Sequence, residues 1–349
     1  MRDVVIFGLP SDPHIVRVAS SLTKLGLTVA NFSPVSDVHL SPADALSWSY
    51  PEATKSPPFA LELPTFSGGS TKIDPSGCIW WMRNKARVYD IKTEDDQRHE
   101  FEINSRQTLV EGIASSYKAR IINRDQTLSS NKVVQLRAAA SLGCLIPETL
   151  ISNDKAKVVA FLNRFPDAIV KPLGVSYVRS VTALPDAHED SFVSIMTNQV
   201  TVAEVAEASE QSHRSAPVIY QRRIMKRREL RVVAFGRDQM IFTVDSQRLR
   251  RTSLDWRRGE ATPGLFKLVS ANSYPSLLTF IPNFLDKLNL DTGVFDFAET
   301  ESGGLVFFEC NPAGQWAILD EVASGQVAEM FAKGINAISN KASQLCSKT

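Results

Sequence analysis

The chain has 349 residues, of which 43% are hydrophobic and 22% charged, and its formal net charge is +1. This length predicts two or three domains, and the balanced charge argues against a nucleic acid or a membrane as partner. The four cysteines and five histidines show no paired or clustered spacing, which argues against a zinc site and a disulfide scaffold. No apolar run reaches membrane-spanning length, and the apolar start is too short for a signal peptide. We therefore expect a cytoplasmic globular protein.

The N-terminal part alternates strand and helix patterns, which is typical of an α/β unit. A stretch rich in Pro, Ser and Gly at residues 41–76 predicts an irregular insert with one short strand. The predicted elements in order are a strand at 3–10, an amphipathic helix at 14–27 ending at Gly26, a strand at 28–34, the short strand at 59–64, a strand at 77–82 and a helix near 105–119.

The remainder mixes helices with strands that are joined by hairpin turns. A helix is predicted at 129–143, with Ser129 or Ser130 as its N-cap and Gly143 as its stop. The elements that follow are a strand at 146–152, a helix at 154–165, strands at 168–174, 217–224, 229–236 and 238–246, a helix at 276–290, a hairpin at 293–316 and a helix at 322–339. We expect domain boundaries that give units 1–125, 126–215 and 216–340, with a tail at 341–349.

The hairpin GVFDFAETESGGLVFFECNPAGQW carries three oxygen ligands on its two arms. If the turn is centred between Ser302 and Gly303, Asp296 lies opposite Glu309, and Asn311 shares the face of Glu309 because side chains alternate along a strand. Two opposed carboxylates repel each other unless a cation lies between them. Carboxylate and amide oxygens suit magnesium, which completes its shell with nucleotide phosphates. The alternative is a pair of solvated carboxylates on an exposed sheet face, and for the hairpin alone this alternative is slightly favoured.

Three basic residues have positions that suit phosphate binding. Lys132 lies in the first turn of its predicted helix, where a cation opposes the helix dipole unless an anion shares the site. Lys171 leaves a buried-looking strand and either extends to solvent or enters a cleft, and the sequence leaves both open. Arg231 alternates with apolar neighbours in ELRVVAFG, so its planar guanidinium points to one face, where it suits a terminal phosphate.

Other motifs narrow the class of enzyme. The basic stretches at 221–230 and 248–258 are more typical of solvated turns, or of a dock for an acidic substrate, than of a nucleic-acid site. The sequence has no Ser-His-Asp or Cys-His arrangement at a recognisable spacing, no GxGxxG loop and no Walker A loop. Dehydrogenases and P-loop kinases are therefore excluded.

The order of these features resembles the ATP-grasp superfamily, and most closely the ligases that install side-chain lactones and lactams in microviridin-type peptides, the graspetides. The resemblance extends from residue 3 to about residue 335. It is carried by IWWMR, IINRDQ, the helix at 129–143, AIVKPLG, VIYQRRIMKRRELRVVAFG, VDSQ, the DWR formed by Asp255, Trp256 and Arg257, VFDF and FFECNPAGQW.

This resemblance implies an α/β (α+β) fold: an N-terminal α/β pre-ATP-grasp domain, a central α+β lid subdomain and a C-terminal antiparallel-sheet subdomain. It implies ATP and Mg²⁺ as cofactors. It also implies roles for individual residues: Asp296, Glu309 and Asn311 as magnesium ligands, Lys132 and Lys171 as nucleotide-binding lysines, Arg231 as the phosphate-binding arginine, Glu229 at the ribose, and the backbone from Tyr220 through Gln221 and Arg222 to Arg223 at the adenine.

The implied activity is transfer of the γ-phosphoryl group to a substrate carboxylate, giving an acyl phosphate that a hydroxyl or an amine attacks. Arg231, Asp296, Glu309 and Asn311 would then be the catalytic residues. The expected partner is a ribosomal precursor peptide with a leader and an acidic core, and the resemblance also implies a homodimer. The alternatives are a ligase that joins amino acids to a small molecule or a protein tail, and a non-catalytic module that binds a nucleotide or a leader peptide.

The chain departs from the family pattern in two places. The stretch after Lys171, at 173–184, has a single glycine where relatives carry a glycine-richer loop over the phosphates. Arg222 occupies a hinge position that is often acidic. We therefore expect altered nucleotide affinity or altered lid closure.

Overall fold

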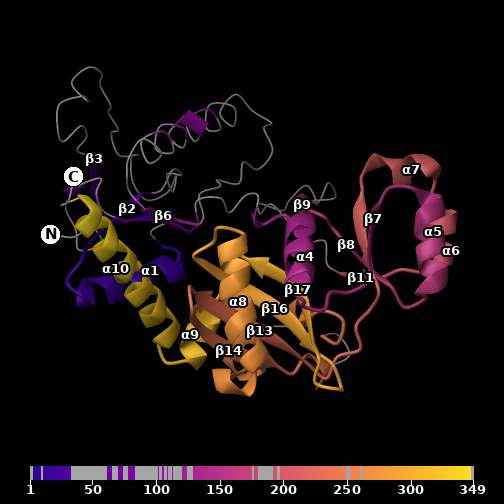
Figure 1. Ribbon diagram of the computed structural model, residues 1–349. Coiled ribbons are helices and arrows are strands. Elements are labelled where there is room, and N and C mark those ends of the chain that lie inside the picture. The colour runs from indigo at the N-terminus through magenta and orange to yellow at the C-terminus, as the bar shows by residue number, and fades with distance from the viewer. Residues whose placement is uncertain are drawn as a thin grey trace, which may run out of the picture.

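A computed structural model describes most of the chain outside the N-terminal insert (Figure 1). The described residues are 3–8, 11–32, 61–64, 70–73, 78–82, 101, 104–105, 108, 112, 120–123, 129–174, 177–179, 192–194, 197–248, 252–259 and 262–346. Most of the predicted helix at 105–119 and most of the loop at 173–184 lie outside these ranges.

The N-terminal unit is a parallel sheet in the order β2-β1-β5-β6. Its elements are β1 (Asp3–Phe7), α1 (Pro13–Lys24), β2 (Thr28–Phe32), β5 (Cys78–Trp81) and β6 (Arg120–Ile122). Gly26 has a φ of +79° just after α1, which confirms the predicted helix stop because glycine adopts this conformation without a steric penalty. In the insert, the short predicted strand is β3 (Leu61–Pro64), and it pairs with β4 (Ser70–Ile73), which the sequence did not indicate.

A five-stranded antiparallel sheet in the order β15-β14-β13-β16-β17 forms the centre of the molecule. It consists of β13 (Arg228–Phe235), β14 (Asp238–Val244), β15 (Phe266–Val269), β16 (Thr292–Glu299) and β17 (Leu305–Asn311). The short 3-10 helices η2 (Ser246–Arg248), η3 (Trp256–Arg258) and η4 (Pro263–Leu265) lie between β14 and β15. Another, η5 (Ala271–Ser273), follows β15.

A smaller antiparallel sheet in the order β11-β8-β12-β7 lies at the far end from the N-terminal unit, beside α5, α6 and α7 (Figure 1). Its elements are β7 (Thr149–Ser152), α5 (Lys155–Arg164), β8 (Ile169–Lys171), β11 (Asn198–Gln199), α6 (Val202–Glu207), α7 (Glu210–Ser215) and β12 (Val218–Gln221). A separate pair, β9 (Tyr177–Arg179) with β10 (Phe192–Ser194), follows β8.

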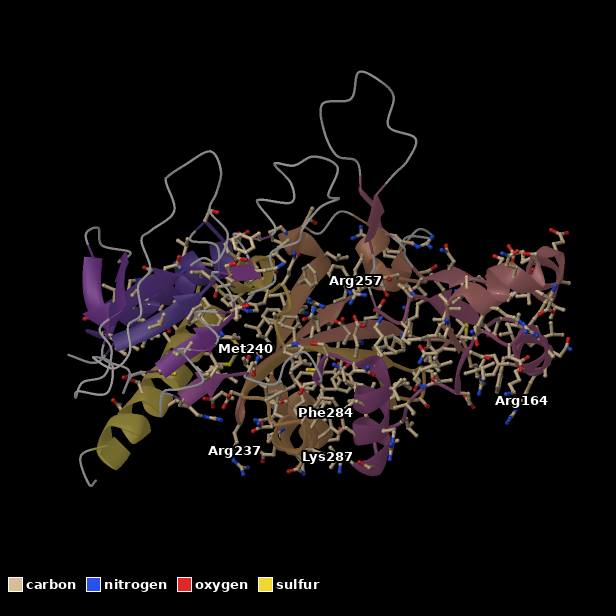
Figure 2. All side chains as sticks on the ribbon, turned by 90° about the horizontal axis from the view of Figure 1, so that it is seen from above. Arg164, Arg237, Met240, Arg257, Phe284 and Lys287 are labelled. Atoms are coloured by element: carbon tan, nitrogen blue, oxygen red, sulfur yellow. The ribbon has the colours of Figure 1, made fainter. Side chains whose placement is uncertain are left out.

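The two faces of the central sheet differ in chemistry. One face is apolar and packs against α4 (Lys132–Ser141) and α8 (Pro275–Lys287), with Phe284 fully buried. Figure 2 shows Phe284 on one side of this sheet and Arg257 on the other. The opposite face is apolar at the end that meets α9 (Ala317–Val322) and α10 (Gln326–Cys346). At its other end this face carries charged side chains, and they form the site described below.

Two predicted helix boundaries were wrong. The N-cap of α4 is Asn131, whose side chain accepts hydrogen bonds from the N–H groups of Val133 and Val134. Ser129 instead donates its hydroxyl to the carbonyl of Leu288, so it is held by a tertiary contact. The predicted helix at 322–339 is interrupted by Ser324 and Gly325, which both have positive φ.

The interruption before α10 has a side-chain cause. Asp320 on α9 accepts a hydrogen bond from the N–H of Ala328 at 2.9 Å, and its other oxygen lies 3.1 Å from Arg17 on α1. The start of α10 is therefore capped by a carboxylate from the preceding helix, which satisfies an N–H group that has no partner within the helix.

Close packing of α10 on β13 depends on Gly334. A Cβ atom at this position would lie 2.3 Å from the ring of Phe235. Gly to Ala in a helix ordinarily stabilises by up to about 1 kcal/mol. Here we expect Gly334→Ala to destabilise instead, by about 1–3 kcal/mol, in urea-induced unfolding. The exposed neighbour provides the control, since Lys333→Ala should change stability by less than about 0.5 kcal/mol; stabilisation by Gly334→Ala would contradict this packing.

Candidate functional site

The predicted hairpin is β16 and β17, and Asp296 pairs directly with Glu309. Near the turn, Glu299 pairs with Leu305, a register that on its own would place Phe308 opposite Asp296. A β-bulge adds one residue to β17 and moves Glu309 into that position. The predicted pairing is therefore confirmed, and it depends on a bulge that the expected turn position did not include.

Arg231 lies opposite Asp296 on the neighbouring strand β13. Its Nη1 is 2.8 Å from Oδ1 and 3.0 Å from Oδ2 of Asp296, and its Nη2 donates to the carbonyl of Gln315 at 2.8 Å. The guanidinium also lies over the ring of Trp256, 5.3 Å from its centroid. Because both side chains are buried, this pair forms a fixed part of the site.

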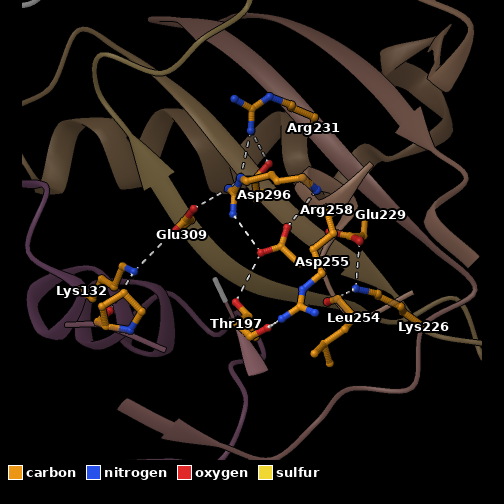
Figure 3. Close-up of polar contacts among 12 residues, drawn as sticks. Lys132, Thr197, Lys226, Glu229, Arg231, Leu254, Asp255, Arg258, Asp296 and Glu309 are labelled. Carbon is orange, nitrogen blue, oxygen red and sulfur yellow. Dashed lines mark hydrogen bonds and ion pairs between the residues drawn. The ribbon is translucent and has the colours of Figure 1, made fainter. Parts of the chain in front are cut away.

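Lys132 and Lys171 approach Glu309 from outside the central sheet. Nζ of Lys132 is 3.7 Å from Oε2 of Glu309 and 3.3 Å from the carbonyl of Pro172 (Figure 3). Lys171 ends β8, and its charge interacts with those of Glu309 and Lys132. Of the two readings that the sequence left open, the structure therefore supports a lysine that enters the cluster.

Burial and neighbouring charges set the pKa values of Lys171 and Glu309 in this cluster. Burial lowers the pKa of Lys171 to about 8, although the charge of Glu309 opposes the shift. Burial acts to raise the pKa of Glu309, but Arg257, Lys132 and Lys171 outweigh it and lower this pKa to about 2. Glu309 is consequently ionised at any physiological pH.

Arg257 is a site residue for which sequence reasoning assigned no role. It lies in η3, and its Nη2 is 2.6 Å from Oδ2 of Asp296 and 2.6 Å from Oε1 of Glu309. One nitrogen thus bridges the two carboxylates. The DWR motif was the only signal in the sequence, and its position some forty residues before the hairpin concealed the contact.

The residues predicted to contact the nucleoside lie around the end of β12 and the start of β13. Gln221 is buried and donates to the hydroxyl of Thr149. Nη1 of Arg222 lies 3.2 Å from Oε1 of Glu148, and its guanidinium lies over the ring of Phe165. This guanidinium is therefore not part of the carboxylate cluster. Arg223 is half-buried.

Glu229 forms a buried ion pair with Lys226, with 2.8 Å between Nζ and Oε1. Burial raises the pKa of Glu229, and Lys226 opposes the rise. Lys226 also donates to the carbonyl of Leu254 (Figure 3). Its Nζ lies 5.8 Å from the ring centroid of Phe308. Glu229 and Lys226 therefore adjoin the bulge of β17, beside the carboxylate cluster.

Asn311 follows Glu309 on the same face, and its Oδ1 accepts from the N–H of Ala313 at 3.1 Å. Side-chain hydrogen bonds fix the backbone on both sides of Asn311. Before it, the side-chain amide of Gln135 both donates to the carbonyl of Cys310 and accepts from its N–H. After it, Asn123 donates to the carbonyl of Pro312 at 3.0 Å.

His14 of α1 holds the end of this segment. Its Nε2 accepts from the N–H groups of Trp316 and Ala317 at 2.9 and 3.0 Å, and its Nδ1 lies 2.6 Å from Asp12. A proton on Nδ1 satisfies all three contacts. The N-terminal unit thereby positions the loop whose Gln315 carbonyl binds Arg231.

These residues fit a magnesium ion. Asp296, Glu309 and Asn311 offer hard oxygen donors on one face, and a cationic group already lies between the two carboxylates. Among the described residues, no group of three or more His, Cys, Asp and Glu side chains could hold a metal.

None of the helices in the described part of the chain could span a membrane.

Comparison with known proteins identifies the fold. No protein-family model and no curated protein matches the chain. Among solved structures, the RiPP-associated ATP-grasp ligase of Chryseobacterium gregarium, in complex with ADP and a leader and core peptide, is 21% identical, with a TM-score of 0.77 over 100% of this chain and 98% of that one. The macrocyclase MdnB of Microcystis aeruginosa is 23% identical, with a TM-score of 0.67 over 96% and 99%.

A third structure, the macrocyclase MdnC of the same organism bound to the precursor peptide MdnA, is 17% identical, with a TM-score of 0.74 over 96% of this chain and 99% of that one. Matches of this quality over the full length of both chains confirm the predicted α/β architecture. The chain therefore has the ATP-grasp fold.

Proposed function

We propose that the protein is an ATP-dependent ligase that activates side-chain carboxylates of a ribosomal precursor peptide as acyl phosphates and forms ester or amide cross-links within the peptide. The observation that carries this proposal is the opposed pair of Asp296 and Glu309, surrounded by Arg231, Lys132 and Lys171 within an ATP-grasp fold. Solved structures with the same fold contain ADP, a leader and core peptide, or a minimal precursor with Mg and ADP.

The chemistry requires no side-chain nucleophile. The bond between the γ-phosphorus and the ADP oxygen breaks as a peptide carboxylate oxygen bonds to that phosphorus. A hydroxyl or an amine of the peptide then attacks the acyl carbon, loses its proton, and phosphate leaves. Each cross-link therefore yields one ADP and one phosphate, and the peptide loses one water mass.

The proposed roles follow the charges of the site. Asp296, Glu309 and Asn311 would hold Mg²⁺, which when bound neutralises phosphate charge. Lys132, Lys171 and Arg231 would bind and orient the phosphates. Glu229 would contact the ribose, and the backbone from Gln221 through Arg222 to Arg223 the adenine. The three units 1–125, 126–215 and 216–340, the homodimer and the cytoplasmic location belong to the same proposal.

The test uses the purified full-length protein with ATP, Mg²⁺ and each short acidic peptide that carries Thr, Ser or Lys and is encoded beside the gene. We expect peptide-stimulated ADP release together with a loss of one water mass per bond in mass spectra. A scrambled peptide of the same composition is the control. Turnover with free amino acids and no peptide would replace the proposal by a small-acceptor ligase, and nucleotide binding without turnover on any of these acceptors would overturn it.

A further inference from the structure

Arg257 occupies the position between two carboxylates that a divalent cation would take. Its Nη2 is 2.6 Å from an oxygen of Asp296 and 2.6 Å from an oxygen of Glu309. In an antiparallel pair, like charges directly opposite each other are destabilising, and a guanidinium donates charge-assisted hydrogen bonds to both. The contact therefore explains how the hairpin holds Asp296 against Glu309 when no metal is present.

The oxygens that Arg257 contacts are the ones that a metal needs. Both oxygens of Asp296 already accept hydrogen bonds, from Arg231 and from Arg257. Glu309 has one oxygen on Arg257 and the other 3.7 Å from Lys132. A cation placed between Asp296 and Glu309 would therefore take the position of this nitrogen, and its charge would repel Arg257.

Arg257 can be displaced from Asp296 more readily than Arg231. The side chain of Arg257 is 41% exposed, and Asp255 in the same turn lies 3.8 Å from its Nη1 as an alternative partner. The side chain of Arg231 is only 8% exposed, and it is additionally held by the carbonyl of Gln315. Of the two guanidinium groups on Asp296, only Arg257 has both solvent and a second carboxylate available to it.

We propose that Arg257 is a resident counter-cation of the metal site: it bridges Asp296 and Glu309 before the metal and nucleotide arrive, and it is displaced towards Asp255 when they bind. Arg257 then sets the affinity of the site for the divalent ion by competing for the same oxygens. This inference rests on the proposed function, because it requires that the carboxylate pair binds a metal.

The test measures the affinity of the full-length protein for Mn²⁺ at saturating ADP, by electron paramagnetic resonance of the free ion. Arg257→Met removes the competitor, and we expect it to bind Mn²⁺ about tenfold more tightly than the wild type. Arg257→Lys retains the charge on a shorter side chain without the planar fork, so its affinity should lie between the two. The Mn²⁺ affinities of the wild type and the two variants can be measured without catalytic turnover.

Arg258→Met is the matched control, because it removes the same charge from the next residue. Arg258 contacts the carbonyl of Thr197 and not the carboxylate pair (Figure 3). It also contacts the side chain of Asn198. We expect its Mn²⁺ affinity to match that of the wild type within about twofold. A similar gain in both variants would reduce the effect to general electrostatics and would overturn the specific role of Arg257.

A second readout covers the fold of the variant. Without metal, Arg257→Met leaves Asp296 and Glu309 facing each other, so we expect a lower melting temperature that saturating Mn²⁺ and ADP restore to the wild-type value. If the wild type binds Mn²⁺ and Arg257→Met binds it equally or more weakly, the inference fails while the proposed function stands. If neither protein binds Mn²⁺ with ADP, the proposed function and the inference are both overturned.

Discussion

Glu309→Gln should reduce peptide-dependent ADP release by about 10²–10³-fold, the range expected when one preorganised electrostatic group is lost from an active site. The substitution keeps the size of the side chain and removes its charge. Arg257, Lys132 and Lys171, which together lower the pKa of Glu309 to about 2, would then have one carboxylate fewer to balance them. Steady-state measurement of ADP release with and without peptide determines the loss.

The matched control for this variant lies in the same hairpin. Glu301 is exposed in the turn between β16 and β17, so Glu301→Gln makes the same chemical change on the same element outside the cluster. We expect its activity to remain within about twofold of the wild type. Activity of Glu309→Gln close to that of Glu301→Gln would contradict the metal role of Glu309.

Asn123→Ala should lower the free energy of unfolding by about 3–5 kcal/mol. Asn123 is fully buried and has a φ of 56°. Its amide donates to the carbonyls of Thr292 and Pro312, and its side-chain oxygen accepts from the N–H groups of Asp291 and Thr292. Removal of the side chain leaves these buried backbone groups without a partner, and alanine also disfavours the left-handed conformation.

Equilibrium urea unfolding measures this loss, and a second variant at the same position separates its two causes. Asn123→Gly also removes the side chain, but glycine adopts a positive φ without a steric penalty. We expect Asn123→Gly to be about 1–2 kcal/mol more stable than Asn123→Ala, and its remaining loss relative to the wild type reports the hydrogen bonds of Asn123. Wild-type stability of Asn123→Gly would show that these bonds contribute nothing.

The network of Asn123 connects stability to the proposed chemistry. Pro312 directly follows Asn311, and Gln135 binds both backbone polar groups of Cys310 directly before it. The proposed third metal ligand is therefore held by Asn123, directly after β6, and by Gln135 of α4, and both residues precede it by more than 170 residues. Such fixed positioning suits a reaction in which the protein supplies orientation and electrostatics without a covalent step.

Local patterns in the sequence determined much of the fold. The period of the apolar residues predicted α1, and Gly26 and Gly143 marked the ends of α1 and α4 because both adopt a positive φ. The hairpin that carries Asp296 and Glu309 on its two arms was predictable because the turn signal and both apolar strands lie within a short stretch of the chain. These are short-range effects, and a single sequence contains all the information they require.

Only the tertiary structure decided the features that depend on distant partners. Ser129, Ser130 and Asn131 are all suitable N-cap residues, and Asn131 takes the role while Ser129 is bound to the carbonyl of Leu288. The bulge at Phe308 shifts the register of β17 by one residue and so brings Glu309 opposite Asp296. The contact of Arg257 with both carboxylates brings η3 to β16 and β17. Sequence periodicity describes which face a side chain occupies, whereas the partner it meets there depends on how separate elements pack together.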